Sequence, residues 1–516
     1  MFETLFILPI SFWVVMALLM GGGLWAFQHR NTGFGLPVLA VLGTVGAWYV
    51  GDAFYNDYAG LYVKEFDPGI MAAAWWQVAV FILAFLLLVP PVHRWINRKY
   101  LGRSSGVLQL FQHGVGYPVI QHQLNLVFSG AAMTWSFLLL VACLVLKGYV
   151  IYYLFPFLGY KASPWSHGQI GHGLDCFSIL AVYLQLLSAT MFGVVAALST
   201  NRRIRRQAIF FLLLSWPFFI LDRTRNSMLA MAIPAVLGWV FLRIRGGLIK
   251  KGLVLLACFL VVNTWMKFVI ANRSHMSITQ AFVDKGLSLG SDEKVHNEGM
   301  NMYEELCWEN TFIENGKYHV KWGGNYFAEL VNPIPRALWP GKPLIGLDYA
   351  IARGHHVINA SGAVDTTIAT GMIGQGVVNF GSWFGPPVAA FLMSLWVAWL
   401  ARLDLTIHKL GCLPLYSLGL ILTFNMGRDI TLLVIYPFVF GALAIWLLER
   451  FRAQNVQAAS APATPRPSGQ PQPASGRGLP FARRASAGGF VKRKASRPSP
   501  VSSPGELKSK ADMLKN

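Results

Sequence analysis

Long apolar segments separated by short polar connections run along most of the chain. A helix needs about 20 predominantly apolar residues to cross about 30 Å of hydrocarbon, and these segments approach or exceed that length. The pattern therefore predicts about eleven membrane-spanning helices. Their expected positions are 5–27, 35–54, 70–91, 125–147, 173–198, 206–221, 227–242, 252–270, 385–401, 411–426 and 430–448.

One long polar interruption divides these segments, between about residues 272 and 384. The chain is therefore expected to have four parts. Helices one to eight occupy 1–271, a large polar loop 272–384, helices nine to eleven 385–449, and a basic tail 450–516. Because backbone groups inside a bilayer must be satisfied within the protein, the expected fold class is an all-α polytopic membrane bundle.

Lys and Arg gather after the third, fifth, seventh and ninth predicted helices, within 94–103, 202–206, 243–251 and 402–409. Short basic connections favour the cytoplasmic side of a membrane. All four clusters become cytoplasmic when the amino terminus lies outside, and so does the tail. The same orientation places the large loop on the outer, periplasmic side, together with the turns at 222–226 and 427–429. Charged groups collected on one side of a membrane bundle indicate a site there.

Composition excludes several classes of protein. Hydrophobic residues make up 54% of the chain and charged residues 13%, which is incompatible with a soluble globular protein of 516 residues. The net charge is +20, but residues 451–516 hold twelve Lys or Arg against two acids, and most other basic residues flank membrane helices. We therefore expect no nucleic-acid partner. The tail is too polar and too rich in Pro, Ser and Gly to fold.

Known cofactor and catalytic signatures are missing from the sequence. The five cysteines show no metal-ligand spacing and no sign of a disulfide framework. There is no Walker A motif, no HExxH, no Asp-x-Asp of nucleotide-sugar metal sites and no GxSxG elbow. The sequence thus indicates no metal and no cofactor. The first apolar segment follows Glu3 rather than a basic stretch, so it is expected to be a retained helix.

The segment 332–343 reads Asn-Pro-Ile-Pro-Arg-Ala-Leu-Trp-Pro-Gly-Lys-Pro. Four prolines preclude a regular helix or central strand and leave a stiff, extended loop. This Pro-rich loop presents Arg336, Trp339 and Lys342 in a nearly fixed relation, which suits the binding of an anionic, lipid-borne substrate. The alternative is that the two charges are merely solvated and that Trp339 anchors in the membrane interface.

Two polar turns on the same side carry further arginines. Arg223 and Arg225 lie in the turn that splits an apolar stretch of the chain, and Arg428 lies between the last two helices. A guanidinium binds diphosphate oxygens through two parallel hydrogen bonds and stays charged at biological pH. The alternative is a simple hairpin turn in which the adjacent acids, Asp222 and Asp429, neutralise the arginines.

A general base would require a carboxylate or histidine within hydrogen-bond reach of a reacting hydroxyl. The His355–His356 pair could serve, although exposed histidine pairs usually have no such role. Short helices are expected nearby, at about 300–311 and 347–353. The loop also offers many carboxylates, among which the sequence alone does not choose: Glu298, Glu304, Glu305, Glu309, Glu314, Glu329, Asp348 and Asp365.

The Pro-rich loop is followed by Thr366–Thr367 and by the run Gly-Gln-Gly-Val-Val-Asn-Phe-Gly at 374–381. With the basic turn at Arg223 and Arg225, and one large outer loop before the last helices, the chain resembles the bacterial oligosaccharide repeat-unit polymerases. These are the Wzy-like O-antigen and exopolysaccharide polymerases. In the expected pattern an acidic residue stands shortly before an aromatic residue followed by glycine, here Phe380–Gly381. This chain has Gln375 where that acid is expected.

The resemblance implies a lipid-dependent (GT-C-like) glycosyltransferase architecture in the bacterial inner membrane. It implies transfer of a growing glycan from undecaprenyl diphosphate to an incoming lipid-linked repeat unit, with a chain-length regulator as a further partner. The arginines at 223, 225, 336 and 428 would hold the diphosphate. Arg336 would act in catalysis, with Asp365 or His355 as the base.

Other functions stay open at this point. A ligase that moves finished glycan to another acceptor would use the same donor on the same face. A transporter or flippase of lipid-linked glycans is a second alternative, although we find no internal repeat of the kind that transporters show. A third is a non-enzymatic scaffold of an export complex that docks through its basic tail.

Overall fold

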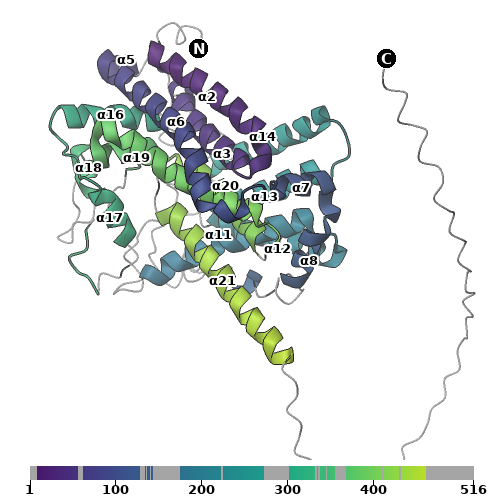
Figure 1. The fold of residues 1–516 in the computed structure, drawn as a ribbon. Coiled ribbons are helices and arrows are strands. Elements are labelled where there is room, and N and C mark those ends of the chain that lie inside the picture. Colours follow the sequence, from purple (N-terminus) through teal and green to yellow (C-terminus); the bar gives the residue numbers. More distant parts are fainter. Residues whose placement is uncertain are drawn as a thin grey trace, which may run out of the picture. The chain divides into compact units, whose positions relative to one another are not determined.

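The computed structural model describes residues 8–55, 58, 62–127, 134, 136–139, 141–142, 175–221, 225–271, 301–331, 334, 338–343, 346–354, 368–409, 411–428, 430 and 432–460. Regular secondary structure within these residues is entirely helical (Figure 1). The helices are α2 (Ile10–Gln28), η1 (Arg30–Thr32), α3 (Gly35–Val45), η2 (Gly46–Val50), α4 (Gly51–Tyr55), α5 (Val63–Glu65), α6 (Pro68–Ile96), η4 (Arg98–Tyr100), α7 (Gly106–His113), η5 (Gly114–Gly116), α8 (Pro118–Val127), α11 (Asp175–Leu198), α12 (Arg202–Leu221), α13 (Arg225–Leu242), α14 (Leu248–Ala271), α16 (Met302–Glu314), α17 (Gly324–Val331), α18 (Leu347–Ala352), α19 (Gly371–Leu405), α20 (Cys412–Met426) and α21 (Leu432–Ser460).

Four described helical segments are long and apolar enough to cross a membrane: Ile10–Gln28, Gly35–Phe54, Pro68–Ile96 and Gly371–Leu405. Shorter apolar helices occur within α11, α13, α20 and α21. The helical class is thus confirmed, and the long apolar helices fit a polytopic membrane protein. The number of eleven spans stays a prediction, because the expected span 125–147 lies mostly outside the described residues.

The centre of the bundle is the pair α6 and α19, which run in the same direction. Asp67 caps α6 by accepting a hydrogen bond from the Gly69 backbone N–H, and proline at the first helical position suits that end. At the other end of α6, the Asn97 side chain donates 2.9 Å to the carbonyl of Ala398, near the end of α19. The contact joins the carboxyl-terminal turns of both helices.

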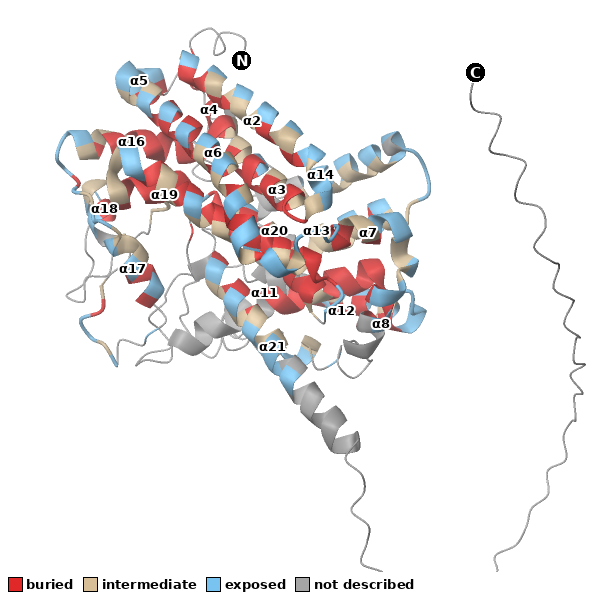
Figure 2. Ribbon diagram, in the orientation of Figure 1, coloured by how far each residue is buried: buried red, intermediate tan, exposed pale blue. Residues whose placement is uncertain are grey.

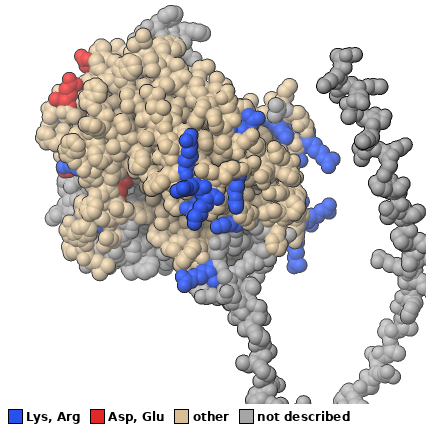
Figure 3. All heavy atoms as spheres, in the orientation of Figure 1, with Lys and Arg blue, Asp and Glu red and all other residues tan. Residues whose placement is uncertain are grey.

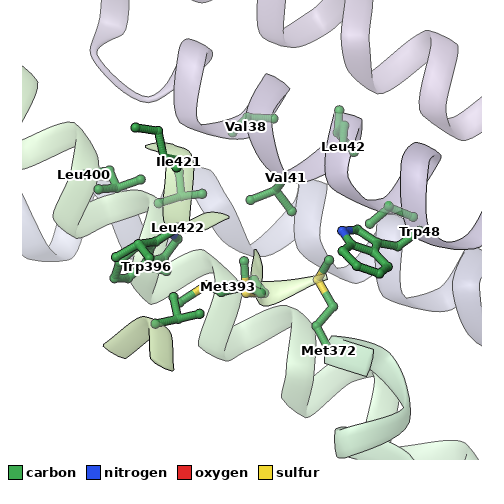
Figure 4. Close-up of a cluster of buried hydrophobic side chains, with 14 of the residues drawn as sticks. Val38, Val41, Leu42, Trp48, Met372, Met393, Trp396, Leu400, Ile421 and Leu422 are labelled. Carbon is green, nitrogen blue, oxygen red and sulfur yellow. The ribbon is translucent and has the colours of Figure 1, made fainter. Parts of the chain in front are cut away.

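Helices α3 and α20 pack against α19 and complete the central core. Figure 4 shows side chains from these three helices and from η2 in one cluster: Val38, Val41, Leu42, Trp48, Met372, Met393, Trp396, Leu400, Ile421 and Leu422. Polar groups inside this core are satisfied across helices. The indole N–H of Trp396 donates 2.8 Å to the Thr423 hydroxyl, and that of Trp48 donates 2.8 Å to the Phe424 carbonyl.

Helix α19 begins at Gly371, well before the expected span at 385–401, and it is kinked at Gly381. Gly381 has φ of 79°, a left-handed conformation that glycine adopts without strain. The kink brings Gly376 and Gly385 so close that a Cβ on either would collide with the backbone of the other. The glycines of the 374–381 run therefore allow two helical segments to meet.

The bundle has two chemically different ends, separated in Figure 1. The loop end is made by α16, α17 and α18. Of these, α16 and α18 confirm the short helices expected near 300–311 and 347–353, and α17 was not predicted. The basic end is made by α7, α8, the first turn of α12 and the last turns of α6, α13 and α19. Most of the Lys and Arg visible in Figure 3 lie toward the basic end, and most of the Asp and Glu lie near α5 and α16.

Candidate functional site

The loop end is built on α16, a helix that is buried around most of its circumference and nevertheless carries three buried acids. Glu304, Glu305 and Glu309 are all less than 5% exposed. The helix packs against α6 and α19, and also touches η2 and α4 (Figure 2). Buried carboxylates are costly unless hydrogen bonds and countercharges hold them, so the neighbours of α16 decide what this end can do.

Asp52 holds the first turn of α16 in place. Its Oδ2 accepts hydrogen bonds from the backbone N–H groups of Tyr303 and Glu304, at 2.9 and 3.1 Å. Its Oδ1 accepts a 2.7 Å hydrogen bond from the Tyr62 hydroxyl. A carboxylate at a helix N-terminus also interacts favourably with the helix dipole. Asp52, in a sequence-distant helix, therefore positions the acidic helix of the loop.

Glu305 is paired with Arg353 in a bidentate geometry. Arg353 donates from Nε to Oε1 at 3.0 Å and from Nη2 to Oε2 at 3.2 Å, and the Tyr349 hydroxyl donates to Oε1 at 2.6 Å. The guanidinium also lies 4.7 Å from the centre of the Trp308 ring. Burial raises the pKa of Glu305, and Arg353 and Tyr349 oppose that shift. The pair ties α16 to the end of α18.

Glu329 and Gln375 join α17 to α19. The Gln375 side-chain amide donates to Glu329 Oε1, and its own oxygen accepts a 3.1 Å hydrogen bond from the Ile430 backbone N–H. The Tyr436 hydroxyl reaches the carbonyls of Glu329 and Leu330, at 3.0 and 2.9 Å. Gln375 thus lies beside the carboxylate of Glu329, which belongs to α17.

The kink in α19 leaves backbone groups that the loop satisfies. The Asn379 side chain accepts a 3.0 Å hydrogen bond from the Asn325 N–H and donates 2.7 Å to the Gln375 carbonyl. The carbonyl of Val378 accepts hydrogen bonds from the Lys321 N–H and the Tyr318 hydroxyl, both at 3.3 Å. Burial raises the pKa of that hydroxyl to about 12, so Tyr318 stays a neutral donor.

Two further contacts close the layer between α6, α16 and α19. Gln77 and Asn310 exchange hydrogen bonds of 2.6 and 2.9 Å, and Ser382 donates 3.0 Å to the Asn310 oxygen. The Glu309 carboxylate lies directly over the Cα of Gly374, where a Cβ would collide with both oxygens. We call Asp52, Glu305, Glu309, Glu329, Arg353 and Gln375 the loop-end cluster.

The described part of the Pro-rich loop is held by its own contacts. Lys342 is 7% exposed, and its ammonium group donates 2.9 Å to the Ile334 carbonyl. Its backbone N–H donates 3.2 Å to the Trp339 carbonyl, and the Trp339 ring lies 6.5 Å from that of Phe327 in α17. Lys342 therefore braces the described part of the loop, and the substrate binding expected of it stays a prediction.

The other predicted site residues are placed only in part. Arg428 is exposed in the turn after α20, and its carbonyl accepts a 2.7 Å hydrogen bond from the Gly371 N–H. Arg225 begins α13, but its side chain lies outside the described residues. Four residues lie outside them altogether: Arg223, Arg336, His355 and Asp365.

Sequence reasoning did not single out Arg353, and it named Glu305, Glu309 and Glu329 only among eight candidate acids. One signal was available, because Glu305 and Glu309 are four residues apart and so share one helix face with apolar neighbours. Among the residues that the structure describes, no group of His, Cys, Asp and Glu is arranged to hold a metal ion.

Comparisons of the chain with protein-family models, with curated proteins and with solved structures give no match.

Proposed function

We propose that the protein is a membrane glycosyltransferase that polymerises lipid-diphosphate-linked oligosaccharide repeat units at the periplasmic face of the bacterial inner membrane. One observation carries the proposal. The helix that leads into the Pro-rich loop, α17, is bonded to the 374–381 run through Glu329–Gln375 and Asn325–Asn379. The resemblance to the repeat-unit polymerases depends on the Pro-rich loop at 332–343 and on the 374–381 run, and α17 is the helix that directly precedes the first of these.

The position of this contact also supports the proposal. It lies at the loop end, away from the basic end that the positive-inside bias assigns to the cytoplasm. An enzyme acting on an exported lipid-linked glycan needs its site on the outer side. In the sequence, Arg336 belongs to the Pro-rich loop, and His355 follows Arg353 by two residues.

In the proposed reaction, an acceptor sugar hydroxyl attacks the anomeric carbon of the growing glycan. A base takes the hydroxyl proton, the new glycosidic bond forms, and the bond from the anomeric carbon to the diphosphate oxygen breaks. The lipid diphosphate leaves with the bonding electron pair. Arg336, with Arg223, Arg225 and Arg428, would offset the charge on that leaving group. Asp365, His355 or Glu329 would be the base, and Glu329 is the one whose position beside Gln375 is described.

The test is a strain lacking this protein, examined for its surface glycan and its lipid-linked intermediates. We expect single repeat units where a long ladder stood, with recovery by the wild-type chain and at most about a hundredth of the ladder with Arg336→Ala. Lys317→Ala, which changes an exposed cation of the same loop, is the matched control and should restore the ladder.

The alternatives give different outcomes. Long chains stranded on the carrier lipid would identify a ligase, and short units trapped on the inner leaflet would identify a flippase. If deletion of residues 455–516 removes function while Arg336→Ala has no effect, the protein is a scaffold and the proposal fails.

A further inference from the structure

A cavity of about 540 Å³ opens at the basic end, far from the loop-end cluster along both central helices. It lies between the last turns of α2 and α6 and the segment that precedes α7. Its apolar wall includes Trp25, Phe34, Pro90 and Leu405, and its polar wall includes His29, His93, Arg94 and Arg103. No described residue with a proposed role in glycan handling belongs to it.

The charge of the cavity is of one sign. None of the described residues that line it is acidic, whereas Arg94 and Arg103 are both exposed arginines. Arg103 lies 5.2 Å from the centre of the Tyr100 ring, and Arg402 lies 5.8 Å from the same ring. Stacking on an aromatic face orients a guanidinium while leaving its edge free to bind. Two guanidinium groups in the lining, those of Arg94 and Arg103, favour an anion with several oxygens.

The two histidines have defined hydrogen-bond roles. His29 Nδ1 is 2.9 Å from the Trp25 carbonyl, which can only accept, so this nitrogen carries the proton. The Asn97 amide nitrogen donates to the Ala398 carbonyl and lies 3.1 Å from His93 Nδ1, so that ring nitrogen accepts. The proton of neutral His93 is therefore on Nε2. His93 offers a donor to an anion without having to be protonated.

Aromatic packing holds these groups in place before any ligand arrives. The rings of Trp25 and His29 are 4.8 Å apart, and those of Phe34 and His93 are 4.9 Å apart. A site that combines fixed donors, two arginines and an apolar wall matches a phosphate group that carries an apolar or ester substituent, better than it matches a simple monovalent anion.

We propose that this cavity binds a phosphate group at the basic end of the bundle, as a second site that does not depend on the proposed function. The phosphate can come from an anionic phospholipid headgroup or from a free phosphate in solution. The aromatic and proline wall would contact the glycerol and upper acyl region in the first case.

The full-length protein in detergent tests this through its unfolding temperature, with added phosphatidylglycerol, phosphatidylcholine or inorganic phosphate. We expect a rise with phosphatidylglycerol, with phosphate, or with both, and no comparable rise with phosphatidylcholine. In the double variant Arg94→Gln/Arg103→Gln, the half-saturating concentration should increase about tenfold. The control Arg202→Gln/Arg203→Gln removes the same charge at exposed sites outside the cavity and should respond as the wild type does.

Arg103→Lys keeps the charge but loses the planar fork, so it should fall between the wild type and the double variant. A response to phosphatidylglycerol alone identifies a lipid site, and a response to inorganic phosphate that the double variant lacks identifies a site for free phosphate. The proposal is overturned if the wild type responds to neither probe, or if the control loses as much affinity as the cavity variant.

Discussion

Glu305 and Arg353 form a bidentate ion pair of which the carboxylate side chain is 2% exposed and the guanidinium side chain 23%. Such a pair is no evidence of high stability, because removing two charges from water offsets most of their attraction. Removing only one partner of the pair lowers stability strongly, because the other charge is then left buried without a countercharge. The pair therefore specifies where α18 docks on α16.

Replacing Arg353 with Met should lower the free energy of unfolding by about 3 kcal/mol at neutral pH, because Glu305 would keep its burial and lose its countercharge. Unfolding of the purified protein in detergent measures this. Lys321→Met is the matched control. It breaks the exposed Lys321–Asp348 pair and should cost less than about 1 kcal/mol. Equal losses in the two variants would contradict the role given to burial.

Glu305 should also make stability depend on pH. Burial raises its pKa in the folded protein above the ordinary value for a glutamate. As pH rises past that ordinary value, the unfolded chain releases this proton before the folded protein does, so the folded state loses stability until pH exceeds the raised pKa. The stability of the wild type relative to Glu305→Gln should therefore fall as the pH rises above about 4. Unfolding midpoints across that range test this, and a constant difference would contradict it.

At the scale of elements, the kinked α19 determines how the loop end is assembled. Its first segment, before Gly381, presents Gln375 and Asn379 to α17, and its second segment packs on α6 and α20. The close approach of Gly376 and Gly385 makes this possible.

Gly376→Ala should therefore lower stability by about 2 kcal/mol, because the added Cβ would meet the backbone of Gly385, which has no rotamer by which to move. Gly43→Ala in α3 is the same substitution where nothing lies within 4 Å of the new Cβ, and it should be neutral or slightly stabilising. The yield and unfolding temperature of the folded protein distinguish them. A Gly376→Ala variant as stable as Gly43→Ala would mean that the two segments of α19 can separate freely.

The whole molecule carries two ends of different chemistry on one set of helices. Helices α6 and α19 run parallel from the loop end to the basic end. If the loop end lies on one side of the membrane, the basic end must therefore lie on the opposite side. The positive-inside bias assigns the basic end to the cytoplasm.

A membrane-impermeant thiol reagent should therefore label Trp322→Cys in intact spheroplasts, because Trp322 is 73% exposed at the loop end. Arg202→Cys, exposed at the basic end, should react only after the membrane is opened. The chain with only its native cysteines gives the baseline. Labelling of Arg202→Cys but not Trp322→Cys in intact cells would invert the orientation and with it the proposed function.

Hydrophobic spacing was sufficient to predict the helical class, because a bilayer leaves few ways to satisfy the backbone of a long apolar segment. It did not predict where α19 begins, since the 371–384 segment is rich in glycine and its helix is stabilised by partners from other segments. The site was predicted only as a region. A charged residue in a loop looks the same in sequence whether it binds a substrate or, as Lys342 does, a neighbouring carbonyl.

The order of apolar and basic segments along the chain therefore establishes a helical membrane protein with a loop end and a basic end, since these properties are local and additive. The partners of Glu305, Glu329 and Asp52 were decided only in three dimensions. Arg353, Gln375 and the first turn of α16 lie far in sequence from the acids that they bind, and burial favours the arrangement that satisfies these groups. The cavity at the basic end arises in the same way, from residues of α2, α6 and α19 that no spacing connects.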